Sequence, residues 1–411
     1  MRPKTAGPAL AVLFLVNVLN FYDRQALGAV LEPLRHEFHL SDAELGAFTT
    51  TFTVLYALAG LPLGRLADTR SRKRLLAAGM TVWAGLTGLG GLAASYAVLL
   101  ATRLGVGIGE AVCAPAATSW IGDLVPAGRR ARAMAGFMMA VPLGGLLSFA
   151  VTGPMAQAHG WRVALAVAAV PAAALAPAVL WLREPGRSGA RPVLAPLRSL
   201  NVPAFWWIAA SGAIVNFVLY SFSTFLPAFL TRFHGLSVAQ AGLWTGIGSG
   251  AAGILGALAA GVLGDRVTGD RGAARMRLCA GAALLAAPLA FAGIRLPAGN
   301  PSAAIALVMA AYGLLQMYYG LVYAAIQDIV PPSLRGTAMA AYFTATYLCG
   351  ASFGPLLTGG LSDRFARVVA GAGPLTEAAK AIGLHQAMYG IPALSVALAA
   401  VLWAGGRKAD R

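Results

Sequence analysis

The stretch IGDLVPAGRRARAMA (residues 121–135) has a counterpart 205 residues further along the chain, IQDIVPPSLRGTAMA (residues 326–340). In this alignment Asp123 falls on Asp328, and the proline, arginine and methionine positions that follow also match. The offset is half of the 411-residue length, so the chain contains two copies of one unit in the same order. Such self-similarity predicts a parallel internal repeat.

A second pair of segments supports this repeat. GRLADTRSRKR (residues 64–74) aligns with GVLGDRVTGDR (residues 261–271) and places Asp68 over Asp265. A basic stretch that contains prolines, residues 183–202, lies between the two copies. We therefore predict an N-terminal six-helix bundle (residues 1–182), this linker on the cytoplasmic side, and a C-terminal six-helix bundle (residues 203–411).

The composition indicates the solvent around these bundles. Hydrophobic residues make up 58% of the chain, charged residues 11%, and the mean hydropathy is +0.71. Soluble domains carry about 25% charged residues, whereas segments of about 20 apolar residues cross a bilayer as helices. The chain is therefore predicted to be an all-α integral membrane protein with the lipid bilayer as its partner. Twelve transmembrane helices are predicted near residues 9–31, 45–67, 74–95, 98–121, 132–157, 162–182, 203–230, 240–263, 275–294, 302–326, 335–360 and 386–404.

The net charge of +16 predicts a topology rather than a nucleic-acid partner. Most of the 31 Lys and Arg residues lie in loops on the same side as the N-terminus. The basic residues assigned to the opposite side are Arg35, Arg162, Arg232, Arg295, Arg364, Arg367 and Lys380. This positive-inside bias predicts that both termini are cytoplasmic.

Two charges interrupt the first predicted span: Asp23 and Arg24, within LNFYDR (residues 19–24). A charge at the bilayer centre costs about 2.5–3.5 kcal/mol, so it normally faces a cavity or a partner. Because neighbours lie about 100° apart around a helix, Asp23 and Arg24 are poorly placed to pair with each other. The fourth span offers Arg103 and Glu110, which share a face about 10 Å apart along the axis. These four charges are predicted to meet.

Two explanations of this charge cluster remain open. One is a structural salt-bridge lock between the first and fourth spans, and the other is a proton-sensitive substrate site. The repeat does not copy the charges, because Arg103 aligns with Val308 and Glu110 with Leu315. That asymmetry favours the functional explanation.

Several of these motifs resemble those of the major facilitator superfamily. GRLADTRSRKR is similar to the superfamily signature between the second and third helices, with departures at Thr69 and Ser71. LNFYDR, GRLADTRSRKR, TRLGVGIGEA (102–111), IGDL and MAVPLGG (139–145) resemble the Spinster branch in order and spacing. The C-terminal half matches mainly at the superfamily level. The resemblance implies the superfamily fold, with two pseudo-symmetric six-helix bundles, and transport of lysophospholipids or phosphorylated sphingoid bases.

The resemblance also implies which residues line a central cavity. In the superfamily the first, fourth, seventh and tenth helices line it, so polar side chains at helical spacing there are candidates: Asn17, Asn20, Asn216, Tyr220, Ser223, Gln316, Tyr319 and Tyr323. One charged half facing one aromatic half would suit a ligand with an ionic head and an apolar tail. Ordinary helix packing remains the alternative for any single tyrosine.

An inner, cytoplasmic gate is a further implication of the resemblance. Its expected members are Asp68 with Arg72 and with Arg129 or Arg130, and in the repeat Asp265 with Arg266. A purely topological role of these arginines is the alternative, although it does not explain the repeated aspartate.

The predicted function is secondary active transport of an amphipathic anionic lipid by alternating access, coupled to protons. Burial disfavours a charged carboxylate, so protonation of Glu110 is expected to free an arginine for the anionic head. Open alternatives are proton symport of small organic anions or sugar acids, antiport of cationic drugs, and a non-transporting membrane sensor. An enzyme is not expected, because no nucleophile–base pair or metal ligands occur at membrane depth.

Several remaining signals predict little chemistry. GVGIGE (105–110) follows no strand, so its glycines are expected to allow close helix contact rather than to bind phosphate. The three cysteines lie in apolar segments and predict no disulfide framework. We expect no cofactor besides a proton gradient, no metal site, and a monomer. Few lysines with many alanines and glycines indicate a GC-rich bacterial genome, and hence the inner (plasma) membrane.

Overall fold

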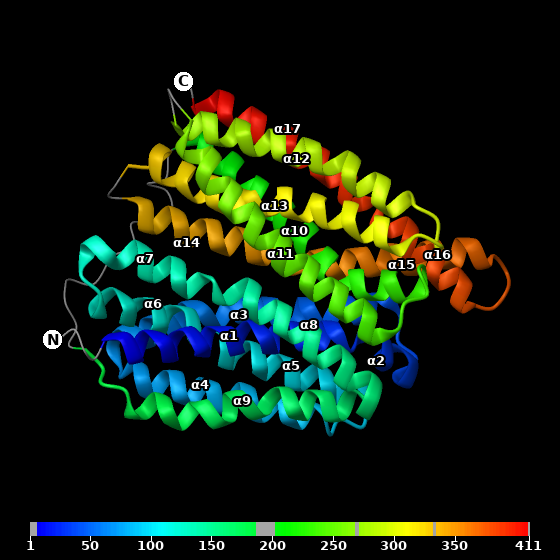
Figure 1. Cartoon of the computed structure of the whole chain (residues 1–411), viewed down its shortest axis with the longest axis horizontal. Helices are drawn as coiled ribbons and strands as arrows, with labels where there is room; N and C mark the ends of the chain where they lie inside the picture. Colours follow the sequence, from blue (N-terminus) through cyan, green and yellow to red (C-terminus); the bar gives the residue numbers. More distant parts are fainter. Residues whose placement is uncertain (1–5, 186–201, 268–270, 332–333, 410–411) are drawn as a thin grey trace. The chain divides into compact units, whose positions relative to one another are not determined.

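The computed structural model describes residues 6–185, 202–267, 271–331 and 334–409, and in these ranges every regular element is a helix (Figure 1). The helices of the first half are α1 (Ala6–Ala29), α2 (Leu31–Phe38), α3 (Asp42–Thr69), α4 (Arg72–Gly90), α5 (Tyr96–Glu110), α6 (Cys113–Leu124), α7 (Ala127–Met138), α8 (Ala140–His159) and α9 (Trp161–Trp181). Those of the second half are α10 (Pro203–Arg232), α11 (Val238–Asp265), α12 (Arg271–Arg295), α13 (Pro301–Ile329), α14 (Arg335–Ala345), the π-helix η4 (Thr346–Ala351), α15 (Phe353–Ala370), α16 (Glu377–Met388) and α17 (Gly390–Ala409).

Eight helical segments of the described chain are long and apolar enough to cross a membrane. They coincide with eight of the twelve predicted spans and comprise residues 96–124, 136–159, 161–181, 203–232, 238–265, 272–295, 301–329 and 377–409. The other four predicted spans are helical too, as α1, α3, α4 and α14–α15. The last predicted span, residues 386–404, lies within the helical segment 377–409, which comprises α16 and α17.

Proline explains where several predicted spans are interrupted. A proline cannot donate a hydrogen bond to the carbonyl four residues earlier. Accordingly α7 ends at Met138, four residues before Pro142, and α16 ends at Met388, four residues before Pro392. The single helix predicted over residues 98–121 is likewise divided after Glu110, ahead of Pro115. This last break places Glu110 at the end of a helix.

The described residues form two compact units. Unit 1 comprises residues 6–40, 51–185 and 238–246, and unit 2 comprises residues 41–50, 202–237, 247–267, 271–331 and 334–409. Two helices are therefore divided between the units, α3 after Thr50 and α11 after Gly246. The predicted linker, residues 183–202, lies mostly outside the described residues.

Unit 1 is built around α1 and α4. α1 packs against α8 and α9, whereas α4 packs against α5 and α9 (Figure 1). Trp83 and Trp120 are fully buried in its hydrophobic core. In unit 2, α12 packs against α13 and α17, and α10 packs against α17 and η4.

The repeated aspartate makes the same kind of contact in both units. In unit 1, Asp123 at the end of α6 accepts a hydrogen bond from the Nη1 of Arg72 at 2.5 Å, at the start of α4. In unit 2, Asp328 at the end of α13 forms an ion pair with Arg275, near the start of α12. The repeat thus retains an acid that joins two neighbouring helix ends within each unit.

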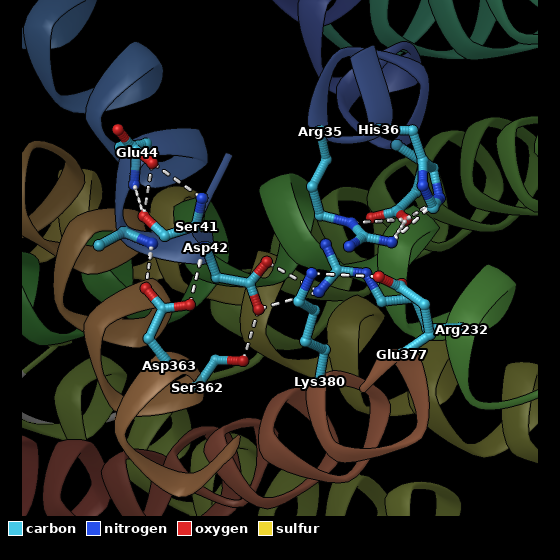
Figure 2. Close-up of polar contacts among 12 residues, drawn as sticks. Arg35, His36, Ser41, Asp42, Glu44, Arg232, Ser362, Asp363, Glu377 and Lys380 are labelled. Atoms are coloured by element: carbon cyan, nitrogen blue, oxygen red, sulfur yellow. Dashed lines mark hydrogen bonds and ion pairs between the residues drawn. The ribbon is translucent and has the colours of Figure 1, made fainter. Parts of the chain in front are cut away.

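The first turn of α3 is held in unit 2 by a second group of charges. Figure 2 shows the Asp363 carboxylate directed at the backbone of α3, where it accepts from the N–H groups of Asp42 and Ala43 at 2.9 and 2.8 Å. Asp42 in turn accepts from Arg232 Nη1 at 2.7 Å and from the Ser362 hydroxyl at 2.5 Å. The side chains of Asp42 and Arg232 are each only 4% exposed.

Candidate functional site

The four charges predicted from the first and fourth spans lie together inside unit 1. Arg24 of α1 pairs with Glu110 at the end of α5, with 3.3 Å between Nη2 and Oε2. Arg103 of α5 faces Asp23 of α1, with 3.9 Å between Nη1 and Oδ2. None of the four side chains is more than 5% exposed. The neighbours Asp23 and Arg24 therefore each take a partner from α5, as their different directions around α1 require.

A threonine that the sequence analysis missed connects one of these pairs. Thr87 of α4 donates a hydrogen bond to Asp23 Oδ2 at 2.8 Å and accepts one from Arg103 Nη2 at 3.1 Å. A single threonine in an apolar helix has no periodic partner that would reveal it in the sequence. Only the packing of α4 against α5 brings Thr87 into the cluster.

Both ion pairs are loose for buried charges. Charge-assisted N–H···O bonds are usually about 2.7–2.9 Å long, and the two pairs here are longer. Among the described residues, Asp23 Oδ1 and Glu110 Oε1 have no hydrogen-bond donor although both oxygens are buried. The charges of the two carboxylates also act on each other. A buried polar group without a partner costs about 1–3 kcal/mol, so this cluster is not the arrangement that stability alone would favour.

Two glycines of the GVGIGE stretch allow α5 to approach its neighbours. A Cβ at Gly107 would lie 2.8 Å from the Phe52 carbonyl of α3, and one at Gly109 would lie 3.0 Å from the Gly79 carbonyl of α4. These distances are shorter than side-chain carbons normally make. The predicted role of the glycines in close helix contact is confirmed, and it is this contact that places Arg103 and Glu110 beside α1 and α4.

The two asparagines predicted from the first span have different surroundings. Asn20 accepts a hydrogen bond from Arg24 Nη2 at 3.5 Å, so it belongs to the charge cluster. Asn17 instead donates from Nδ2 to the Phe137 carbonyl of α7 at 2.9 Å. Asn17 and Asn20 are both buried, at 3% and 2% exposure, and the lining of a cavity by Asn17 stays a prediction.

The polar stripes predicted on the seventh and tenth spans meet inside unit 2. The Tyr319 hydroxyl of α13 donates to Asn216 Oδ1 of α10 at 3.2 Å. Tyr319 also packs against Tyr323, with ring centroids 5.7 Å apart, and Gln316 donates to the hydroxyl of Tyr312 at 3.0 Å. Ser223 and Tyr220 are half-buried on α10, and the Tyr220 ring packs edge-on against Tyr347. Tyr312 and Tyr347 were not predicted.

The residues predicted for the cytoplasmic gate are only partly described. The side chains of Asp68 and Arg130 lie outside the described part of the chain. Arg129, Asp265 and Arg266 are exposed.

The pairing of Arg72 with Asp68 stays a prediction, since the Asp68 side chain lies outside the described residues. Arg72 is fully buried, and among the described residues it forms ion pairs with Asp123 and Glu184, both acids of unit 1. Arg72 begins α4, and the two acids lie near the ends of α6 and α9. Its charge therefore serves the interior of unit 1.

Metal chemistry has no support from the arrangement of side chains. In the ranges that the structure describes, no group of three or more His, Cys, Asp or Glu residues could hold a metal ion. The charge cluster contains two acids and two bases, a set suited to binding an ion and to exchanging a proton.

Comparison with known proteins identifies the family. The sequence model of the Major Facilitator Superfamily matches residues 13–355. The chain belongs to this superfamily. An MFS-type efflux pump of Mycolicibacterium smegmatis is 32% identical over 369 residues, which cover 88% of this chain and 85% of the pump. Family and fold are thus those of multi-pass membrane transporters.

Within the superfamily the chain belongs to the Spinster branch, as its motifs predicted. Protein spinster homolog 1 of Homo sapiens is 29% identical over 401 residues, 89% of this chain and 75% of the human protein. A bacterial homolog of the human lysosomal transporter Spinster, solved in an inward-facing and unoccupied conformation, superposes with a TM-score of 0.85. That structure is 26% identical, and the superposition covers 99% of this chain and 98% of the homolog.

Proposed function

We propose that this protein is a proton-coupled secondary transporter of an amphipathic anionic lipid, of the lysophospholipid or sphingoid-base-phosphate kind. The observation that carries the proposal is the charge cluster of Asp23, Arg24, Arg103 and Glu110, which is buried and yet loosely paired. Ionisable groups within membrane helices mark substrate and proton pathways by default. A site with unused carboxylate oxygens retains the capacity to take up a proton.

The arginines provide the anion-binding half of the proposal. A guanidinium presents five N–H donors in a planar fork that matches a phosphate or a carboxylate. In the described state Arg24 donates to Glu110 and Arg103 donates to Thr87. An anionic head group would therefore compete with Glu110 for Arg24.

Glu110 provides the proposed proton switch. It interacts with the carboxylate of Asp23, and two neighbouring negative charges repel each other, so a proton on one of them relieves that repulsion. Protonation of Glu110 removes its attraction for Arg24, and the guanidinium then becomes available to the anionic head. Substrate and proton would bind together. Because they would bind one conformation of the transporter more tightly than the other, they would shift the equilibrium between the two.

The remaining parts of the proposal concern topology and the inner gate. We propose twelve membrane spans, cytoplasmic termini, a monomer, and the bacterial inner membrane as its location. The positive-inside bias of the Lys and Arg residues supports the orientation. The proposed gate residues are Asp68, Arg72, Arg129, Arg130, Asp265 and Arg266, and full transport by Asp68→Asn would argue against that role.

A second candidate function is export of an amphipathic compound in exchange for protons. It is favoured by the similarity to the efflux pump of Mycolicibacterium smegmatis. The same charge cluster would serve it, with Asp23 and Glu110 rather than the arginines facing a cationic substrate.

The test is flux in proteoliposomes. Labelled lysophospholipid is followed with and without an imposed pH gradient, in the wild type, in Glu110→Gln, and in the control Glu37→Gln, whose acid pairs with Arg162 at the surface. We expect flux that responds to the gradient in the wild type and the control, and a loss of that response in Glu110→Gln. A wild-type pH profile in Glu110→Gln would refute the proton switch. Flux of a labelled lipophilic cation without lysophospholipid flux would favour the second candidate.

A further inference from the structure

Three aromatic rings surround the guanidinium of Arg24. Its Cζ lies over the ring of Tyr56 at 4.3 Å from the centroid, over Phe21 at 4.8 Å and over Phe52 at 5.2 Å. Phe21 precedes Arg24 by three residues on α1, while Phe52 and Tyr56 are four residues apart on α3, so each helix presents one face to the guanidinium. The Phe52 and Tyr56 rings are stacked, with 6.0 Å between centroids. We call Phe21, Phe52 and Tyr56 the aromatic cage.

The cage gives Arg24 a second set of attractive contacts besides its ion pair. A cation over an aromatic face within about 6 Å is attracted to the ring, more strongly when both are shielded from water. All three rings meet this distance, and the Arg24 side chain is only 5% exposed. The carboxylate of Glu110 is 3.3 Å from both Nε and Nη2 of Arg24. That distance is longer than a normal charge-assisted bond.

We propose that Phe21, Phe52 and Tyr56 are positioning residues, which keep the Arg24 guanidinium in place when Glu110 no longer neutralises it, so that its N–H donors can bind an anionic group. The attraction to the rings does not depend on the protonation state of Glu110. A cation–π contact offers no hydrogen-bond acceptor to the N–H groups, so it does not compete with an anion for these donors. This inference rests on the proposed function in assigning the anion, but the positioning role can be tested without any substrate.

Tyr56 provides the sharpest variants because its ring and its hydroxyl can be separated. Tyr56→Phe keeps the ring and removes the hydroxyl, whereas Tyr56→Leu removes the ring and keeps an apolar side chain. The cage requires that Tyr56→Phe behaves like the wild type and that Tyr56→Leu does not. A role of the hydroxyl would instead make Tyr56→Phe the defective variant.

The substrate-independent test is chemical modification of Arg24 with phenylglyoxal, a reagent for arginine, followed by mass spectrometry of the purified protein. We expect slow modification of Arg24 in the wild type and in Tyr56→Phe, and several-fold faster modification in Tyr56→Leu. Modification of Arg24 in Glu110→Gln should remain slow, because the rings still hold its guanidinium. Equal rates in the wild type and Tyr56→Leu, or a fast rate in Glu110→Gln, would overturn the positioning role. Arg103, which lies outside the cage, is the internal reference.

The functional test is lysophospholipid flux as a function of substrate concentration and pH. In Tyr56→Leu we expect a KM raised about five- to thirty-fold, which is about 1–2 kcal/mol at 1.4 kcal/mol per tenfold. The pH response should persist, because Glu110 is unchanged. An unchanged KM in Tyr56→Leu would contradict the proposal. A rise in KM of the same size in Tyr56→Phe would contradict it as well.

The two tests separate failure of the cage from failure of the proposed function. If the wild type moves no lysophospholipid, the lipid assignment fails, and the phenylglyoxal rates still decide whether the rings hold Arg24. The modification rates of Arg24 can differ between Tyr56→Leu and the wild type while KM for lysophospholipid stays the same. In that case the rings hold Arg24 but Arg24 does not bind this anion, which refutes the proposal.

Discussion

Two groups of buried acids in this protein have opposite hydrogen-bonding arrangements. In unit 2, both carboxylate oxygens of Asp42 and both of Asp363 accept hydrogen bonds from described partners. In unit 1, Asp23 and Glu110 each keep one buried oxygen without a donor among the described residues. The first arrangement stabilises the start of α3, whereas the second retains unused capacity for a proton or a ligand.

The difference teaches that burial of a charge does not by itself identify a functional site. Asp42 and Asp23 are buried to a similar degree, at 4% and 2% exposure. What separates them is whether each carboxylate oxygen has a donor, because a buried ion pair contributes to stability only when the remaining hydrogen bonds of its carboxylate are also made. Variants in both groups test this difference.

The largest effect is expected from Arg232→Ala. It leaves Asp42 buried without its cation, and removing one partner of a buried pair costs about 3–5 kcal/mol. Thermal unfolding of the purified protein in detergent measures the loss. The control is Arg162→Ala, which breaks an exposed pair with Glu37 and should cost about 1 kcal/mol or less. Equal losses in the two variants would remove the distinction between the arrangements, and the milder Arg232→Lys serves if Arg232→Ala does not fold.

A smaller loss of stability is expected from Gly359→Ala. Its Cβ would collide with the Asp42 carbonyl oxygen, a backbone atom that cannot rotate away. Overpacking of this kind typically costs about 1–3 kcal/mol. The next residue offers a matched control, since a Cβ at Gly360 would meet nothing within 4 Å. Gly360→Ala should leave the unfolding temperature unchanged or raise it, and a loss equal to that of Gly359→Ala would contradict the close contact.

Glu110→Gln should reduce stability less than either of these variants, by about 1 kcal/mol or less, while it removes the pH response of transport. Arg24 keeps its contacts with the aromatic rings, each worth up to about 2 kcal/mol when shielded from water. The unfolding temperature and the flux are measured on the same preparation. A stability loss as large as that of Arg232→Ala would indicate that the cluster is a structural lock, the alternative left open by the sequence.

The smallest effect is a pH dependence of stability at Glu184. Burial alone would raise its pKa, but hydrogen bonds from the backbone of Arg72, the Ser71 hydroxyl and the Arg72 guanidinium together lower the pKa below the ordinary value. A lowered folded-state pKa stabilises the fold above the unfolded pKa of about 4.3, and this stabilisation is lost as the pH falls through the lower folded value. Unfolding temperatures between about pH 6 and pH 3 should decline less in Glu184→Gln. If the unfolding temperatures of the wild type and of Glu184→Gln fall by the same amount over this pH range, Glu184 makes no such contribution to stability.

Much of the candidate site could be predicted because its signals are local. Asp23 and Arg24 stand out in an apolar helix, and the seven-residue spacing of Arg103 and Glu110 places them on one face. The repeated aspartate was visible as well, and it forms an arginine pair in each unit. The resemblance of the motifs to the Spinster branch then named the family correctly.

Other features depend on which helices become neighbours. Thr87, Phe52 and Tyr56 contribute to the cluster from α4 and α3, and their spacing in the sequence does not distinguish them from core residues. The partners of Arg72 likewise come from the ends of α6 and α9, far away in the sequence.

The sequence by itself therefore determined the membrane class, the repeat and the four central charges, since hydropathy, self-similarity and helical periodicity are properties of short segments. The tertiary structure decided which charges have complete partners, which rings surround Arg24, and that the first turn of α3 belongs with unit 2. These outcomes depend on the close approach and relative rotation of helices, which are set by side-chain packing between segments distant along the chain.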